Sequence, residues 1–195
     1  MDAIILAGGE NRRIPAIKGF LKINGKRIIE SDIELFAGLF TRIFISTNNP
    51  EWYFYLGCSM VGDIINQRGP MTGIFSMLIN PGISEVFVAA CDMPFINVLL
   101  VKYIIDKWDK RWDASVPIFN RQPQPLLGIY SKRIVERMEE SIKSGRRSLR
   151  HFLKRSNVLY ICEDEVRKID AEGRSFVNIN TMEDFQREGG EICLV

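Results

Sequence analysis

Histidine and cysteine are scarce in this chain of 195 residues, which has one histidine and four cysteines. The cysteines form no C-x-x-C pair and lie far apart, at Cys58, Cys91, Cys162 and Cys193. Their spacing predicts neither a zinc site nor a disulfide framework, and a chain of this length buries enough surface to fold without cross-links. We therefore expect reduced thiols, which are typical of a cytoplasmic protein.

Long apolar runs and an excess of one charge are also missing. No stretch approaches the ~18 apolar residues of a membrane-spanning helix, and the apolar run at 3–7 is too short for the core of a signal peptide. Lysine and arginine total 26 against 24 acidic residues, a net charge of +2. A dedicated nucleic-acid-binding protein has a strong basic excess. We therefore expect neither nucleic acid nor membrane as a partner.

Short apolar runs alternate with segments of helical periodicity. The runs typical of strands are 3–7, 42–47, 59–62, 85–90, 114–118, 126–130, 158–161 and 175–178. Helices are expected at 31–40, 72–80, 98–108, 132–143, 148–155 and after Thr181, with Ser31, Asn97, Ser148 and Thr181 as N-caps. This alternation predicts an α/β fold, a Rossmann-like three-layer sandwich with a mostly parallel sheet. No shift in composition marks a linker, so we expect one domain over 1–195.

The first strand is followed by a pair of glycines and by basic residues. Gly8 and Gly9 let the backbone approach a ligand closely, and Arg13 and Lys18 follow within ten residues. Such a segment is equally consistent with phosphate binding and with a plain strand-to-helix turn whose basic side chains are solvated. Neither a P-loop nor a dinucleotide-binding fingerprint matches the spacing.

Polar side chains also follow three further strands and one late segment. Ligands of parallel α/β sheets bind beyond the carboxyl ends of the strands, where these residues are expected. A carboxylate at the end of the fourth strand suits Mg²⁺ bridged to phosphates. Each residue alone is also explained by a turn or a helix cap, but together they favour a nucleotide site. They are Ser46, Thr47, Asn48, Asp63, Asp92, Asn178 and Asn180.

Several segments resemble one enzyme family. Residues 6–18 resemble the signature L-A-G-G-x-x-x-R-x-G-x-D-K of nucleotidyltransferases with a Rossmann-like fold. Residues 69–73, 91–95, 124–130, 148–153 and 177–181 narrow the resemblance to the molybdenum cofactor guanylyltransferases. The resemblance extends over nearly the whole chain, from Ala3 to about Phe185.

This resemblance implies transfer of GMP from GTP to molybdopterin, release of pyrophosphate and a requirement for Mg²⁺. It further implies transient contacts with cofactor-assembly proteins or molybdoenzymes. The catalytic residues that it implies are Arg13, Lys18 and Asp92, with Asp92 as the Mg²⁺ ligand. The implied nucleotide-binding residues are Leu6, Ala7, Gly8, Gly9, Lys18, Asp63, Asp92 and, for one amide of the family, Ser46 or the neighbouring Asn48.

The chain departs from the signature at two positions. Pro15 replaces its glycine and removes an N–H that could contact phosphate, and Ile17 replaces its aspartate. Three alternatives follow: a guanylyltransferase with altered loop geometry, a related nucleotidyltransferase that uses CTP or a sugar phosphate, or a non-catalytic nucleotide-binding protein. We favour retained activity because Lys18, Asp63 and Asp92 are present.

The segment from Lys132 to Arg155 is strongly basic. It has nine basic and three acidic residues, so its charge is +6 while the rest of the chain sums to −4. For most of these residues a solvated helix face is the simpler interpretation. Arg147 and Arg150 flank the cap at Ser148, and helix N-termini favour phosphate. We expect them, together with Asn178 and Asn180, to bind the acceptor molybdopterin.

Overall fold

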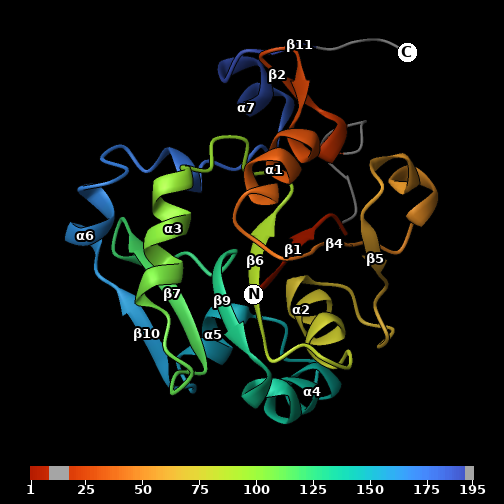
Figure 1. Ribbon diagram of the computed structural model, residues 1–195, viewed down its shortest axis with the longest axis vertical. Coiled ribbons are helices and arrows are strands. Elements are labelled where there is room, and N and C mark those ends of the chain that lie inside the picture. Colours follow the sequence, from red (N-terminus) through yellow and green to blue (C-terminus); the bar gives the residue numbers. More distant parts are fainter. Residues whose placement is uncertain (9–17, 192–195) are drawn as a thin grey trace.

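A computed structural model describes residues 1–8 and 18–191. Its centre is an eight-stranded sheet with the strand order β10-β7-β9-β6-β1-β4-β5, in which β8 pairs with β7 (Figure 1). The strands are β1 (Asp2–Leu6), β4 (Ile43–Ser46), β5 (Ser59–Val61), β6 (Glu85–Ala90), β7 (Ala114–Phe119), β8 (Gln122–Pro123), β9 (Leu127–Ser131) and β10 (Val158–Ile161).

The sheet is parallel around β1. Ala3 of β1 lies opposite Ile43 of β4 on one side and Phe87 of β6 on the other. The pairs β4–β5 and β7–β10 are also parallel, whereas β9 runs antiparallel to both β6 and β7. The expected α/β architecture with a mostly parallel sheet is confirmed. The carboxyl ends of β1, β4, β5 and β6 consequently meet at one edge.

Helices cover both faces of the sheet because side chains alternate along each strand. Ala3 and Ile5 face one core with α1, α3 and α6, and Ile4 and Leu6 face a second core with α2, α4 and α5. The helices are α1 (Ile28–Ala37), α2 (Pro70–Leu78), α3 (Val98–Lys107), α4 (Val135–Lys143), α5 (Leu149–Leu153), α6 (Glu163–Arg167) and α7 (Met182–Arg187). Short 3₁₀ turns are η1 (Lys18–Phe20), η2 (Pro50–Trp52), η3 (Phe54–Leu56), η4 (Lys132–Ile134) and η5 (Arg174–Phe176).

A small second sheet was not expected from the sequence. It joins β11 (Gly190–Glu191), β2 (Lys22–Ile23) and β3 (Lys26–Arg27), and lies with α7 at one end of the molecule (Figure 1). Its core contains Ile23, Ile28 and Phe185, so it joins segments from opposite ends of the chain. Strands of two residues give too little periodicity for prediction from sequence.

Three expected helix caps are confirmed. Their side-chain oxygens accept hydrogen bonds from backbone N–H groups: Asn97 from Leu99 at 2.9 Å, Ser148 from His151 at 3.2 Å and Thr181 from Asp184 at 3.0 Å. The caps fix where α3, α5 and α7 begin.

Three element predictions were wrong. Helix α1 begins at Ile28 and not after Ser31, because Ile28 is buried and its N–H donates to Leu21 O at 3.0 Å. The segment 175–178 forms no strand, because the Ser175 N–H donates to Asp170 Oδ2 at 2.8 Å within η5. The helix expected from 132 starts as η4 and becomes α-helical at Val135.

No disulfide joins Cys58, Cys91 and Cys162, and Cys193 lies outside the described residues. Among the residues that the structure describes, none of the helices is both long and apolar enough to cross a membrane.

Candidate active site

The backbone beyond β1 is held between the ends of its two neighbouring strands. The Ala7 N–H donates to Ser46 O at 2.9 Å, and the Cys91 N–H donates to Leu6 O at 3.1 Å. Gly8 is exposed at this edge, and a Cβ added there would meet only Ser46 O, at 3.8 Å. Gly8 does not need a positive φ. Its contribution is therefore an open backbone beside the ends of β4 and β6.

A cleft of about 690 Å³ opens beside these strand ends. The cleft is lined by five of the residues that the sequence predicted for the nucleotide, namely Leu6, Gly8, Ser46, Asn48 and Asp63. Sequence reasoning missed most of its far wall, although part of that wall belongs to the segment 69–73 that carried the family resemblance. The missed lining residues are Asn49, Asn66, Gln67, Arg68, Gly69, Pro70 and Gly73.

Asn48 and Asp63 form a reciprocal pair at the cleft. Asn48 Nδ2 donates to Asp63 Oδ2 at 2.8 Å, and the Asp63 N–H donates to Asn48 Oδ1 at 2.8 Å. Burial raises the pKa of the Asp63 carboxyl, while the Asn48 hydrogen bond and the positive charge of Arg68 act in the opposite direction. The pair fixes a carboxylate and an amide at adjacent positions. Such groups can bind the N–H donors and carbonyl acceptor of a nucleobase.

Ser46 is covered by α2 and not open to solvent. It is buried, and a Cβ added at Gly73 would lie 2.6 Å from Ser46 Oγ and 3.1 Å from Leu6 Cδ2. Gly69 precedes α2 with a φ of 150°, a backbone conformation that favours glycine. The N-terminus of α2, where the helix dipole is positive, therefore opens at the cleft wall.

Arg147 lies in this cleft. With the Gln67 amide oriented to satisfy both neighbours, its nitrogen donates to Ile142 O and its oxygen accepts from Arg147 Nε at 3.1 Å. Gln67 thereby holds the guanidinium at the cleft that Asn48 and Asp63 also line. The structure places Arg147 with the residues predicted for the nucleotide.

The other residues predicted for the acceptor lie elsewhere. The described lining of the cleft does not include Arg150, Asn178 or Asn180. Ile179, between the two asparagines, donates its N–H to Asp92 O at 2.9 Å, so their segment lies beside the loop after β6. The four residues predicted to bind the acceptor together are therefore not brought together.

A buried carboxyl group that sequence reasoning missed lies near Asp92. Asp32 occupies the apolar side of α1 and only 2% of its surface is exposed. Burial raises the pKa of Asp32 well above its usual range, and the negative charge of half-buried Asp92 raises it further. The available signal was an acidic residue at helical spacing from Ile28, Ile29 and Phe36, which are all buried.

Two carboxyl groups, one on α1 and one after β6, are candidates for holding a divalent cation. Asp32 Oδ2 is buried and has no hydrogen-bond partner, and Asp92 follows the carboxyl end of β6. Within residues 1–8 and 18–191, no group of three or more His, Cys, Asp or Glu side chains is arranged to hold a metal. Mg²⁺ is commonly bound through one or two carboxylates, with substrate phosphates and water as further ligands, so the donor set suits Mg²⁺ with a nucleotide.

Comparison of the chain with known proteins shows the family to which it belongs. A family model described as "MobA-like NTP transferase domain" matches residues 3–159. This chain belongs to the MobA-like NTP transferase family. Two curated relatives are a probable molybdenum cofactor guanylyltransferase from Peptoclostridium acidaminophilum and a molybdenum cofactor guanylyltransferase from Syntrophotalea carbinolica. The former is 35% identical, covering 95% of this chain and 87% of the relative, and the latter is 33% identical, covering 95% and 89%.

A solved structure supports the same assignment. Molybdopterin-guanine dinucleotide biosynthesis protein A from Archaeoglobus fulgidus superposes with a TM-score of 0.84 at 29% identity, covering 97% of each chain. The resemblance inferred from the motifs of the sequence is thus confirmed for this MobA-like NTP transferase.

Some residues predicted for the site of this MobA-like NTP transferase lie outside the described residues. They are Gly9 and Arg13, together with the two departures from the signature, Pro15 and Ile17. Lys18 begins η1, but its side chain is not described. The roles expected for these residues stay predictions.

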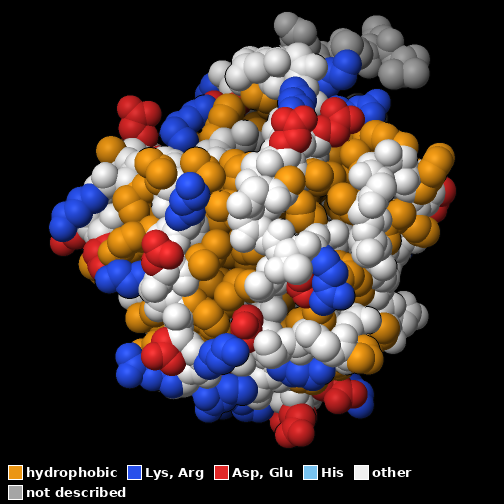
Figure 2. Space-filling model, in the orientation of Figure 1, with side chains coloured by type: hydrophobic (Ala, Val, Ile, Leu, Met, Phe, Trp, Pro, Cys, Tyr) orange, Lys and Arg blue, Asp and Glu red, His pale blue; other side chains and the backbone are white. Residues whose placement is uncertain are grey.

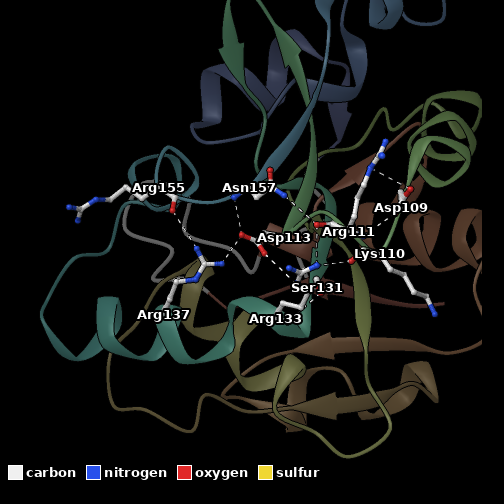
Figure 3. Close-up of polar contacts among 9 residues, drawn as sticks. All are labelled: Asp109, Lys110, Arg111, Asp113, Ser131, Arg133, Arg137, Arg155 and Asn157. Atoms are coloured by element: carbon white, nitrogen blue, oxygen red, sulfur yellow. Dashed lines mark hydrogen bonds and ion pairs between the residues drawn. The ribbon is translucent and has the colours of Figure 1, made fainter.

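The basic segment of this MobA-like NTP transferase is partly structural. Asp113, at the start of β7, accepts hydrogen bonds from Arg137 Nη2 at 2.6 Å and from the Asn157 N–H at 2.9 Å (Figure 3). Arg133 Nε lies 3.9 Å from Asp113 Oδ1, and Arg133 Nη1 donates to Arg111 O at 3.1 Å. Arg133 and Arg137 thus hold α4 to the strand ends opposite the cleft.

The remaining basic side chains of this segment are mostly exposed. Figure 2 shows lysine and arginine gathered at the end of the molecule where α4 lies. Arg150 is exposed there, on α5. Most of this segment is therefore a solvated face, which is the simpler interpretation of its charge, and Arg147, although exposed, differs by lining the cleft.

Proposed function

We propose that this protein transfers GMP from GTP to molybdopterin, releasing pyrophosphate and forming the guanine dinucleotide of the cofactor. The proposal depends on one observation above all. Residues from the ends of β1, β4 and β5 line one cleft, and five of them are among the residues that the family resemblance assigned to the nucleotide. The named relatives are guanylyltransferases, which supports GTP as the donor.

The reaction joins two phosphates. A terminal phosphate oxygen of molybdopterin attacks the α-phosphorus of GTP in line, a new P–O bond forms, and the bond from the α-phosphorus to the bridging oxygen breaks. The electron pair of that bond leaves with pyrophosphate. A phosphomonoester has its second pKa near ~6, so the nucleophile is anionic at pH 7. No general base is needed, and the exposed His151 on α5 has no catalytic task.

Charge neutralisation and positioning then do most of the catalysis, as in other phosphoryl transfers. Asp92 would hold Mg²⁺, which when bound supplies positive charge at the phosphates. Arg13 and Lys18, which follow β1 in the sequence, would stabilise the leaving pyrophosphate. The N-terminus of α2, at Gly69 and Pro70, adds a positive dipole at the same wall.

The polar groups of the cleft suit guanine and the donor phosphates. Guanine has adjacent N–H donors at N1 and N2 and an acceptor at O6, and Asp63 and Asn48 present matching groups at adjacent positions. Arg147 shares their cleft, so we assign it to GTP and not to the acceptor. Asn178 and Asn180, beside the loop of Asp92, stay on the acceptor side, and Arg150 has no assigned role.

A panel of nucleotides tests the function. Purified protein is incubated with molybdopterin, Mg²⁺ and either GTP, ATP, CTP or UTP, and released pyrophosphate is measured. We expect release with GTP alone. Asp92→Asn should abolish it while leaving the circular dichroism spectrum unchanged, and Glu34→Gln, at an exposed position of α1, should keep normal turnover.

Other outcomes assign the chain differently. Release with CTP, or with a sugar phosphate in place of molybdopterin, identifies a related nucleotidyltransferase. Nucleotide binding without pyrophosphate release under any condition identifies a non-catalytic relative, which the substitutions Pro15 and Ile17 would then explain.

A further inference from the structure

Asp32 lies inside the protein at a place where an acidic side chain is costly. It is in the second turn of α1, a helix that packs on β1 and β4, and its burial is nearly complete. The helix directs Ile29 and Phe36 into the same apolar core. Burying an ionised carboxylate is strongly unfavourable unless a cation or hydrogen-bond donors compensate it.

The structure provides Asp32 with little compensation of this kind. Its Oδ2 atom is buried and accepts no hydrogen bond. Buried polar atoms in folded proteins are nearly always paired, so each exception calls for a specific explanation, including an ion that completes the site. The cost of the orphaned oxygen falls away if a bound cation is its partner.

A second carboxyl group follows the strand next to β1, on the side of the sheet where α1 packs. Asp92 comes directly after the carboxyl end of β6, and its chain neighbour Cys91 packs in the same core cluster as Ile29 and Phe36 of α1. The negative charge of Asp92 also raises the pKa of Asp32. Two carboxylates that lie near one another repel, and a bound cation relieves that repulsion. Asp92 is also the residue proposed to hold Mg²⁺, and Mg²⁺ sites often use two carboxylates with substrate phosphates as further ligands.

We propose that Asp32 and Asp92 hold the divalent cation together, with the buried Asp32 oxygen as a second protein ligand. The inference rests on the proposed function, because that function places the cation at Asp92. It adds a ligand from α1, so the metal would link this helix to the loop after β6. The same interaction would orient the Asp92 carboxylate toward the phosphates.

Binding of Mn²⁺, a spectroscopic substitute for Mg²⁺, tests the proposal without any turnover. The electron paramagnetic resonance signal of free Mn²⁺ gives its dissociation constant for the wild-type protein and for Asp32→Asn, Asp92→Asn and Glu34→Gln. We expect Asp32→Asn to weaken Mn²⁺ binding by at least ~10–100-fold, because loss of an outer-shell group alone has an effect of this size and Asp32 is proposed as a direct ligand. Glu34→Gln, on the exposed side of the same helix, should bind Mn²⁺ like the wild type.

Thermal unfolding separates this role from a purely structural one. Without metal, Asp32→Asn should melt at the same temperature as the wild type or higher, because it replaces a buried carboxyl group that has an unpaired oxygen with a neutral amide of the same shape. With Mn²⁺, the wild-type melting temperature should rise and that of Asp32→Asn should rise less. If Asp32→Asn does not fold, Asp32→Ser is measured in the same two experiments.

The two single variants keep the two proposals distinguishable. If Asp92→Asn loses Mn²⁺ binding and Asp32→Asn retains it, Asp32 is a buried neutral acid and only this inference fails. If Asp92→Asn also retains wild-type Mn²⁺ affinity, the metal role of Asp92 in the proposed function fails as well. A loss of Mn²⁺ affinity in both variants, with Glu34→Gln unaffected, establishes the shared site.

Discussion

Asn48 and Asp63 hold each other in place at the cleft through two hydrogen bonds, both of 2.8 Å. Because each residue follows a different strand, the pair joins the ends of β4 and β5. A ligand that binds there meets a carboxylate whose orientation is already fixed, so little side-chain entropy is lost on binding.

Asp63→Asn should weaken the binding of a GTP analogue without unfolding the protein. The amide keeps the shape of the side chain but loses the charge, and a hydrogen bond to a charged group contributes ~1.5–3 kcal/mol, which corresponds to roughly a ten- to hundredfold change in affinity. Isothermal titration calorimetry measures the dissociation constant. Asp109→Asn, at an exposed position, is the matched control, and equal affinities for both variants would remove Asp63 from the site.

Arg147 and Arg150 are separated by three positions but have different surroundings. Arg147→Ala should raise the dissociation constant of the GTP analogue, because its guanidinium lines the cleft and is held by Gln67. Arg150→Ala should leave the constant unchanged, because Arg150 is exposed outside the cleft lining. Calorimetric titration at two salt concentrations checks both. If Arg150→Ala raises the dissociation constant more than Arg147→Ala does, the assignment of Arg147 to GTP is wrong.

At the scale of elements, the approach of α2 to the ends of β1 and β4 shapes the cleft. Gly73 permits that approach, since a Cβ there would lie 2.6 Å from Ser46 Oγ. The cleft wall and the core beneath it therefore depend on the same residue.

Gly73→Ala should destabilise the protein by ~1–3 kcal/mol, the usual range for overpacking, and should weaken nucleotide binding as α2 moves outward. Gly38→Ala is the control, because Gly38 has a φ of −87° and nothing within 4 Å of an added Cβ. Urea unfolding gives both free energies of unfolding. A Gly73→Ala protein as stable as Gly38→Ala would show that α2 is not tightly constrained by β4.

Helix α4 is attached to the opposite end of the sheet through Asp113. Burial by itself would raise the pKa of this carboxyl, but the hydrogen bonds from Arg137 and Asn157 outweigh burial and lower the pKa. A lowered folded-state pKa means that the stabilisation is present above the pKa of the unfolded chain, near ~3.9, and is lost as the pH falls through the folded-state pKa.

Asp113→Ala should therefore lower the free energy of unfolding by about 1.5–3 kcal/mol at pH 7, with a smaller difference from the wild type at pH 3. Denaturant unfolding across pH 3–7 measures this difference. Asp109→Ala, whose carboxylate is exposed and pairs with Arg111, should show a small difference at every pH. A constant difference for Asp113→Ala would mean that its charge does not contribute.

At the scale of the whole molecule, charge is distributed unevenly. The chain is nearly neutral, but the segment from Lys132 to Arg155 is not, and the acidic excess lies elsewhere. Such an asymmetry steers charged ligands over distances near the Debye length, about 8 Å at physiological salt. Because Asp113 neutralises part of this charge, the steering field is weaker than the sequence alone suggests.

GTP with Mg²⁺ should stabilise the whole protein more than ATP, CTP or UTP. A ligand that binds only the folded state adds ~2.7 kcal/mol at a hundredfold excess over its dissociation constant. Differential scanning fluorimetry compares the four nucleotides at equal concentration. Equal shifts for all four would contradict guanine selectivity, and the absence of any shift would favour the non-catalytic alternative.

The sequence by itself determined most of the local elements and the membership of the family. Strand-like apolar runs and the caps at Asn97, Ser148 and Thr181 act over a few residues, so their outcome is visible in the chain. The rule that ligands bind at carboxyl strand ends then placed Ser46, Asn48 and Asp63 together, and the structure does the same. The number of domains stays a prediction.

Only the tertiary structure decided which distant residues meet. Arg147 is 84 positions from Asp63 in the sequence, yet both line one cleft, because α4 and α5 return the chain to α2. The orphaned oxygen of Asp32 and its proximity to Asp92 depend on how α1 packs over the sheet. Side-chain periodicity predicts which face of a helix is buried. It does not predict which charged residue of another element packs near that face.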